Sequence, residues 1–247
     1  MRTLFQFVLL LAAAGGASAS DGLSDARAAR SLLGPTVWAR VARIDNAPDR
    51  GAWRRNPYPR TVYALVFELS GVLWFYTDTD GTQSLSLRFG SLDTDEADPG
   101  PLFLAIDPAF RGWSWVGDGP DLPAPPPGGL PNGCFVESVA AFLRRIAVGG
   151  RADAPRLLSY YVDTASGRRG HTVLVFDARG GLSAIDPELS ERPVELPAYL
   201  GADPRSLSAY LRGGPVAAAR IFPIGGGRGI VTSSRWAALP RPAPPAS

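Results

Sequence analysis

"PNGCFVESVAAFLRR" (residues 131–145) is the stretch that decides how this chain is organised. Its apolar residues recur every three or four positions, which predicts an amphipathic helix over residues 134–148. Asn132 or Gly133 can cap the start of this helix, and the glycines at 149–150 end it. We expect its packed face to consist of Phe135, Val139, Phe142, Leu143 and Ile146.

The predicted helix begins at Cys134, the only cysteine of the chain. A free thiol is often a buried apolar group, and in an oxidising compartment it can instead form a disulfide with another chain. A helix N-terminus, however, presents unpaired amides and a positive dipole end, which favour the thiolate. The position of Cys134 therefore leaves three interpretations open: packing, an intermolecular disulfide, or a nucleophile.

A β-hairpin is predicted by "GHTVLVFDARGGLSAIDP" (residues 170–187). Its first strand is almost wholly apolar and rich in β-branched residues, so we expect it to be central and covered on both faces. The only histidine, His171, opens this strand, and Asp186 closes the next. If the turn is centred after Ala178, the two residues lie directly opposite; one position later, they lie diagonally. Either register places both on one face, where the carboxylate can orient the imidazole.

Together the two stretches resemble the core of transglutaminase-like cysteine enzymes, in the wider papain-like group. The resemblance covers residues 130–190: the helix ends in a Leu-Arg pair followed by glycines, Gly170 precedes the histidine, and Pro187 follows the aspartate. It implies an α+β fold in which a helix carrying the nucleophile packs on an antiparallel sheet, preceded by a β-rich region. Bacteriocin-processing-type papain-like peptidases share this spacing, so the branch stays open.

The resemblance also implies the roles of the site residues: Cys134 as nucleophile, His171 as base and Asp186 as the group that orients the base. Two positions depart from the family pattern, because Val173 replaces a common aromatic residue and Gly128 replaces the glutamine of the papain oxyanion hole. The expected oxyanion donors are the backbone amide of Cys134, the side chain of Asn132, or an indole of Trp113 or Trp115.

Residues 1–19 have the pattern of a cleaved signal peptide. Arg2 precedes an apolar run that is too short for a membrane span, and "ASA" (residues 17–19) suits signal peptidase. We therefore expect a secreted or periplasmic protein whose mature chain has no membrane span.

The remaining chain is predicted to contain a β-rich region (residues 20–116), a Pro/Gly-rich linker (117–131), a transglutaminase-like or papain-like domain (132–236) and a disordered tail (237–247). Residues 20–34 form either a short helix or a loose arm. The early strands are expected at residues 36–44, 61–69, 72–78 and 84–92, with a tight hairpin at 70–71. Later elements are expected as a strand at 157–163, a loop at 164–170, a helix at 204–211 and a strand at 216–223.

Composition excludes several chemistries. The chain has a net charge of +2 and no lysine, so Schiff bases, Ser-Lys dyads and Walker-type phosphate loops cannot be built. Its arginines are scattered, which argues against a nucleic-acid partner. One cysteine and one histidine cannot form a structural zinc site, and the acidic stretches at 78–81 and 93–100 lack the complete pattern of a calcium loop. We predict neither a metal nor a cofactor.

These observations predict an exported thiol hydrolase or acyltransferase that acts on an amide or peptide bond of a protein or peptide substrate. The sequence does not decide between hydrolysis and transfer to an amine. The alternative is a non-catalytic binding or structural module of the cell envelope, an inactive papain-like descendant. In that case the β-rich residues 36–116 carry the function and Cys134 is a packing residue.

Overall fold

The computed structural model describes residues 22–46, 61–70, 72–78, 81–84, 100, 103–104, 110–117, 123–150, 152–165, 167–178 and 180–224. Over these ranges the chain is an α+β protein with two antiparallel five-stranded sheets and few helices. This confirms the predicted fold class at that level. The predicted signal peptide and tail lie outside the described residues.

The first sheet has the strand order β4-β3-β2-β1-β5. Leu69 pairs with Val72 across a two-residue turn, and Ser70 has a positive φ of 56°, which confirms the predicted hairpin. The helix alternative for residues 20–34 is correct, since α1 (Gly22–Leu33) packs against this sheet. The strands are β1 (Ala39–Asn46), β2 (Thr61–Leu69), β3 (Val72–Thr77), β4 (Gly81–Ser84) and β5 (Phe110–Trp115).

The second sheet has the strand order β10-β6-β7-β8-β9. Its strands are β6 (Asp153–Thr164), β7 (Gly167–Ala178), β8 (Gly181–Asp186), β9 (Ser190–Glu195) and β10 (Ala218–Pro223). Leu174 and Phe176 of the central strand β7 belong to one apolar cluster, and Val173 and Val175 belong to another. The prediction of a central strand covered on both faces is therefore confirmed. The short turn η1 (Ala198–Leu200) leads to helix α5 (Pro204–Arg212), whose Leu207 is buried in the second cluster.

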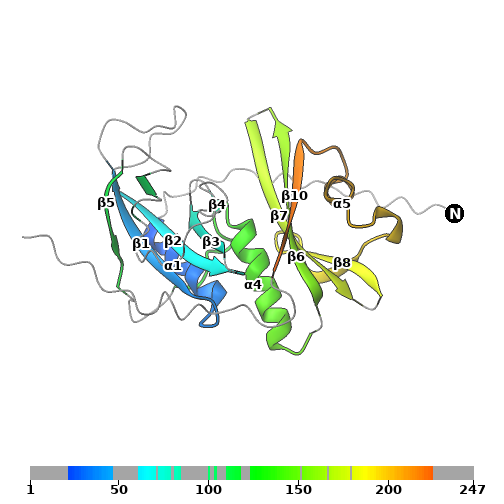
Figure 1. The fold of residues 1–247 in the computed structure, drawn as a ribbon, viewed down its shortest axis with the longest axis horizontal. Coiled ribbons are helices and arrows are strands. Elements are labelled where there is room, and N and C mark those ends of the chain that lie inside the picture. The colour runs from blue at the N-terminus through cyan, green and yellow to red at the C-terminus, as the bar shows by residue number, and fades with distance from the viewer. Residues whose placement is uncertain are drawn as a thin grey trace, which may run out of the picture.

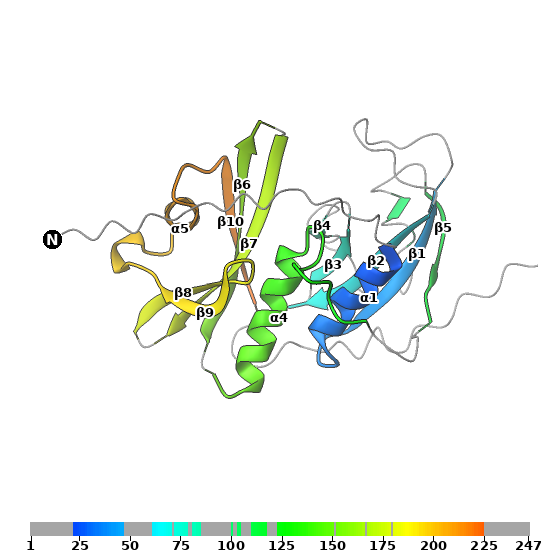
Figure 2. The same ribbon diagram turned by 180° about the vertical axis from the view of Figure 1, so that it is seen from behind.

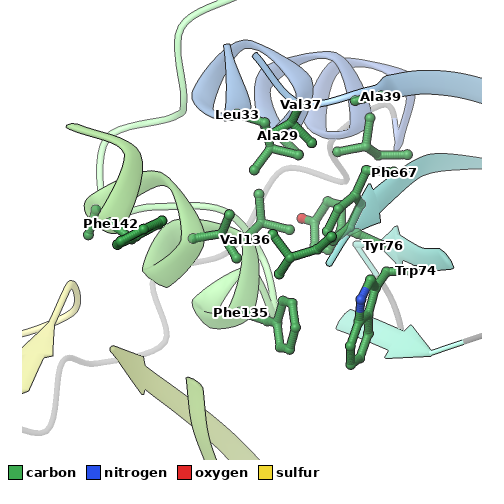
Figure 3. Packing of buried hydrophobic residues seen from close by; sticks show 14 of the residues in the cluster. Ala29, Leu33, Val37, Ala39, Phe67, Trp74, Tyr76, Phe135, Val136 and Phe142 are labelled. Carbon is green, nitrogen blue, oxygen red and sulfur yellow. The ribbon is translucent and has the colours of Figure 1, made fainter. Parts of the chain in front are cut away.

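Helix α4 (Cys134–Ala147) lies between the two sheets (Figures 1 and 2). One apolar cluster continues from α1 and the first sheet through α4 to β6, β7 and β8. Figure 3 shows part of it, with Phe135 and Val136 of α4 near Phe67, Trp74 and Tyr76 of the first sheet. The two sheets therefore share one helix and one core.

The packed surface of α4 is wider than its sequence pattern predicts. Phe135, Val139 and Phe142 are buried as expected, but Val136 and Ala140 are also fully buried, while Ile146 is 42% exposed. A helix between two sheets is covered on two sides, so a single apolar stripe underestimates its contacts. Gly149, with φ 74°, lies just beyond the helix end as predicted, and the cap at the start is Gly133 without a side-chain hydrogen bond.

Several predicted boundaries are wrong. Residues 164–170 are not a loop, because β6 and β7 continue as a ladder to the pair Thr164–Gly167. Residues 81–83 were expected in a turn but form β4, and the predicted strand beyond Ser84 lies outside the described residues. Strands β5 and β9 were not predicted. Their sequences, "FRGWSW" and "SERPVE", contain Gly or Pro, which obscure a strand pattern.

Candidate active site

Cys134 is the first residue of α4, and its side chain is partly exposed. Gly133 occupies the N-cap position, and no side chain caps this end. The backbone hydrogen bonds of the helix begin when the Glu137 amide donates to the Gly133 carbonyl at 2.9 Å. The N-cap residue therefore supplies no side-chain acceptor to the first amides of α4, which lie beside the thiol.

The segment that leads into Cys134 is fixed by hydrogen bonds from two sides. The hydroxyl of the fully buried Tyr76 donates to the Pro131 carbonyl at 2.8 Å. The Leu130 amide donates to the Glu137 carboxylate at 2.7 Å. Burial raises the pKa of Glu137, although this hydrogen bond opposes the shift. The turn before the nucleophile position is thus tied both to β3 and to the first turn of α4.

The imidazole of His171 contacts the Asp186 carboxylate, with 2.9 Å between Nε2 and Oδ2. Leu174 pairs with Ile185, so the turn is centred one position after Ala178–Arg179 and Asp186 lies diagonally from His171. This is one of the two registers left open by the sequence. The two side chains are 16% and 15% exposed, so the pair is largely desolvated but accessible.

The Cys134 thiol lies within hydrogen-bonding reach of the same imidazole. His171 lies beyond the end of the β7–β8 ladder, which begins at Leu174, so α4 can approach the ring there. Burial by itself lowers the pKa of His171, but hydrogen bonds with Asp186, Cys134 and Glu188 outweigh burial and hold that pKa well above its ordinary value.

Glu188 is a site residue that the sequence interpretation missed. Its Oε1 lies 3.4 Å from His171 Nδ1, the ring nitrogen not used by Asp186. The Glu188 amide donates to Asp186 Oδ1 at 3.1 Å, so one carboxylate positions the segment that carries the other. The hydrogen bond with His171 lowers the pKa of Glu188. Strand alternation could not have identified it, because Glu188 lies in the turn after β8 and beyond the residues that pair with β7.

Two further contacts fix the elements that carry the site. Tyr160 of β6 pairs with His171, and their rings meet edge to face at 5.5 Å. The buried Ser138 hydroxyl of α4 donates to the Thr172 carbonyl of β7 at 2.9 Å. Ser138 therefore ties α4 to the strand of His171 at a point one helical turn after Cys134.

The expected oxyanion donors have different positions in the structure. The Asn132 side-chain amide donates to the Asp78 carbonyl at 2.6 Å, so one of its N–H groups is used in holding the segment before α4. Its role as an oxyanion donor stays a prediction. Trp113 and Trp115 pack in an apolar cluster with Val62, Ala64 and Val66, on the face of the first sheet opposite to Leu65 and Phe67. That face is turned away from α4, so the indole alternatives are wrong.

Among the described residues, no three His, Cys, Asp or Glu side chains are arranged to hold a metal ion. No helix in the described ranges is long and apolar enough to cross a membrane. Comparisons of the chain with protein-family models, with curated proteins and with solved structures find no significant match. The site is therefore defined by its own geometry: a thiol at a helix start, an imidazole within reach of it, and two carboxylates on the two ring nitrogens.

Proposed function

We propose that this protein is a thiol enzyme that acts on an amide or peptide bond, with Cys134 as nucleophile, His171 as base and acid, and Asp186 as orienting carboxylate. The observation that carries this proposal is the convergence of the three side chains, from α4, β7 and β8, at one partly exposed place. Cys134 and His171 are the only cysteine and the only histidine of the chain.

The first chemical step follows from the hydrogen-bond pattern. The Nε2–H of His171 donates to Asp186, which leaves Nδ1 to receive the thiol proton of Cys134. Sulfur then attacks the substrate carbonyl carbon, and the carbonyl π electrons move to oxygen. The resulting oxyanion can accept hydrogen bonds from the amides at the start of α4, which have no side-chain cap. Each such donor contributes about 3 kcal/mol to transition-state stabilisation in other enzymes.

The second step breaks the carbon–nitrogen bond. The oxyanion re-forms its carbonyl, and the leaving nitrogen takes the proton from Nδ1 of His171. This leaves an acyl-enzyme thioester on Cys134 and a free amine. Attack by water, with His171 as base, regenerates the thiol and releases an acid; attack by a second amine transfers the acyl group instead. The arrangement of Cys134 and His171 is compatible with both hydrolysis and acyl transfer.

We also propose that α4 and the second sheet form a papain-like or transglutaminase-like core. The support is a helix that begins at the nucleophile and packs against the central strand of an antiparallel sheet, with histidine and aspartate on adjacent strands. A protein or peptide substrate and a secreted or periplasmic location belong to the same proposal, and the location rests on the pattern of residues 1–19 alone.

The test is the alkylation of Cys134 by iodoacetamide between pH 5 and 9, followed by intact-protein mass. Because the chain has one cysteine, the mass change reports this thiol alone. We expect faster labelling of the native protein than of the urea-unfolded protein at pH 6, and loss of that advantage in His171→Ala. Equal labelling rates for the folded and the unfolded protein would show that Cys134 is not an activated nucleophile and would contradict the proposal. Retained biological function in Cys134→Ala would instead support the non-catalytic module.

A further inference from the structure

We propose that Glu188 is a positioning residue that competes with Cys134 for the Nδ1 proton of His171 and thereby sets the pH range in which the thiol reacts. This inference rests on the proposed function for its meaning, but the contact itself is independent of catalysis. It assigns a purpose to a carboxylate that a Cys-His-Asp arrangement does not need.

The two carboxylates contact different nitrogens of the imidazole and differ in their exposure to solvent. Asp186 binds Nε2 at 2.9 Å and is mostly buried, whereas Glu188 is 3.4 Å from Nδ1 and its side chain is 59% exposed. Once Nε2 is engaged by Asp186, Nδ1 is the nitrogen left for the thiol. Glu188 thus occupies the position from which a thiolate would accept the imidazolium proton.

The charge of Glu188 acts on the imidazole. A carboxylate beside the ring favours its protonated form, so Glu188 raises the pH at which His171 loses its proton. Loss of that proton ends the pairing of imidazolium with thiolate. Glu188 therefore moves the upper end of the pH range in which the pair exists to higher pH.

The other groups around the pair do not replace Glu188. Asp186 and the edge of the Tyr160 ring contact the imidazole from neighbouring strands. Glu137 of α4 interacts with both His171 and Glu188, but its carboxylate already accepts the Leu130 amide. Two arginines act on the surroundings electrostatically, Arg169 of β7 on Glu188 and Arg212 of α5 on Tyr160. Among these, Glu188 alone adds a negative charge at Nδ1.

The segment around Glu188 allows it to leave the ring without unfolding the site. Glu188 lies beyond the end of β8, and its amide is held by Asp186 Oδ1 at 3.1 Å. Its backbone is thus fixed while its exposed side chain can rotate into solvent. Substitution of the side chain should leave the His171–Asp186 contact intact.

The experiment uses the full chain without a histidine tag, so that His171 gives the only imidazole signal in proton NMR. In Glu188→Gln we expect the pKa of His171 to fall by about one unit, at the low end for a charge partner because Glu188 is half exposed. The change in the rate of iodoacetamide labelling that accompanies loss of the His171 proton should move down in pH by the same amount, about one unit. Glu195→Gln removes the same charge from β9 and is the matched control.

An unchanged His171 titration in Glu188→Gln, or equal shifts in Glu188→Gln and Glu195→Gln, overturns the inference. So does a shift of the histidine titration that leaves the labelling profile in place. These outcomes differ from failure of the proposed function, which shows in the unsubstituted protein as a thiol no more reactive than an unfolded one. If Glu188→Gln does not fold properly, Glu188→Asp is the second variant to measure. Its shorter carboxylate should shift the pKa of His171 by an intermediate amount.

Discussion

Replacing Asp186 with asparagine should destabilise the fold in a pH-dependent manner. The substitution keeps an acceptor near His171 Nε2 but removes the charge from a contact of 2.9 Å between side chains that are 16% and 15% exposed. Charge-assisted hydrogen bonds contribute about 1.5–3 kcal/mol and are about twice as strong as neutral ones. We therefore expect Asp186→Asn to lower the free energy of unfolding by roughly 1–2 kcal/mol at pH 5.5.

The sign of the pH dependence follows from the raised pKa of His171 in the folded protein. The stabilisation is fully present below the pKa of the unfolded histidine, about 6.5. It declines as pH rises from there toward the folded pKa, because the unfolded state loses its proton first. The difference between Asp186→Asn and the unsubstituted protein should thus be largest at pH 5.5 and narrow by pH 9.

The assay is urea unfolding followed by tryptophan fluorescence at pH 5.5, 7 and 9. Asp177→Asn is the matched control, since Asp177 pairs with Arg156 at 2.8 Å but is 51% exposed, and such surface pairs contribute about 0–1 kcal/mol. The reasoning is refuted if Asp186→Asn costs the same at all three pH values, or if Asp177→Asn costs as much.

Three packing predictions test how the site is held. Ser138→Ala leaves the Thr172 carbonyl without its donor and should cost about 1–2 kcal/mol in urea unfolding; a neutral result would mean that this bond does not tie α4 to β7. Gly133→Ala would place a Cβ in steric conflict with Leu130 Cβ, so both the free energy of unfolding and the rate of Cys134 labelling should drop. An unchanged labelling rate would contradict the fixed geometry of this turn. Phe135→Ala opens the core between the sheets and should cost about 3–5 kcal/mol; a loss below 1 kcal/mol in thermal or urea unfolding would be inconsistent with tight packing there.

The sequence determined the local elements that carry the site. The three- and four-residue spacing of apolar residues predicted α4 from Cys134, and the apolar run after His171 predicted a strand covered on both faces. Strand alternation placed His171 and Asp186 on one face in either register. These predictions were possible because backbone geometry sets the periods of helices and strands. The spacing of apolar residues along a short stretch of sequence therefore indicates which of the two forms.

Only the tertiary structure decided which groups meet around His171. The register of the β7–β8 hairpin made Asp186 diagonal to His171. The turn after β8, in which the Glu188 amide donates to Asp186 Oδ1, brought Glu188 to the second ring nitrogen. Cys134 approaches His171 because of the way α4 packs between the two sheets. The spacing of apolar residues within α4 does not specify that packing. Long-range contacts of this kind are set by the core as a whole, whereas propensity and pattern act within a few residues.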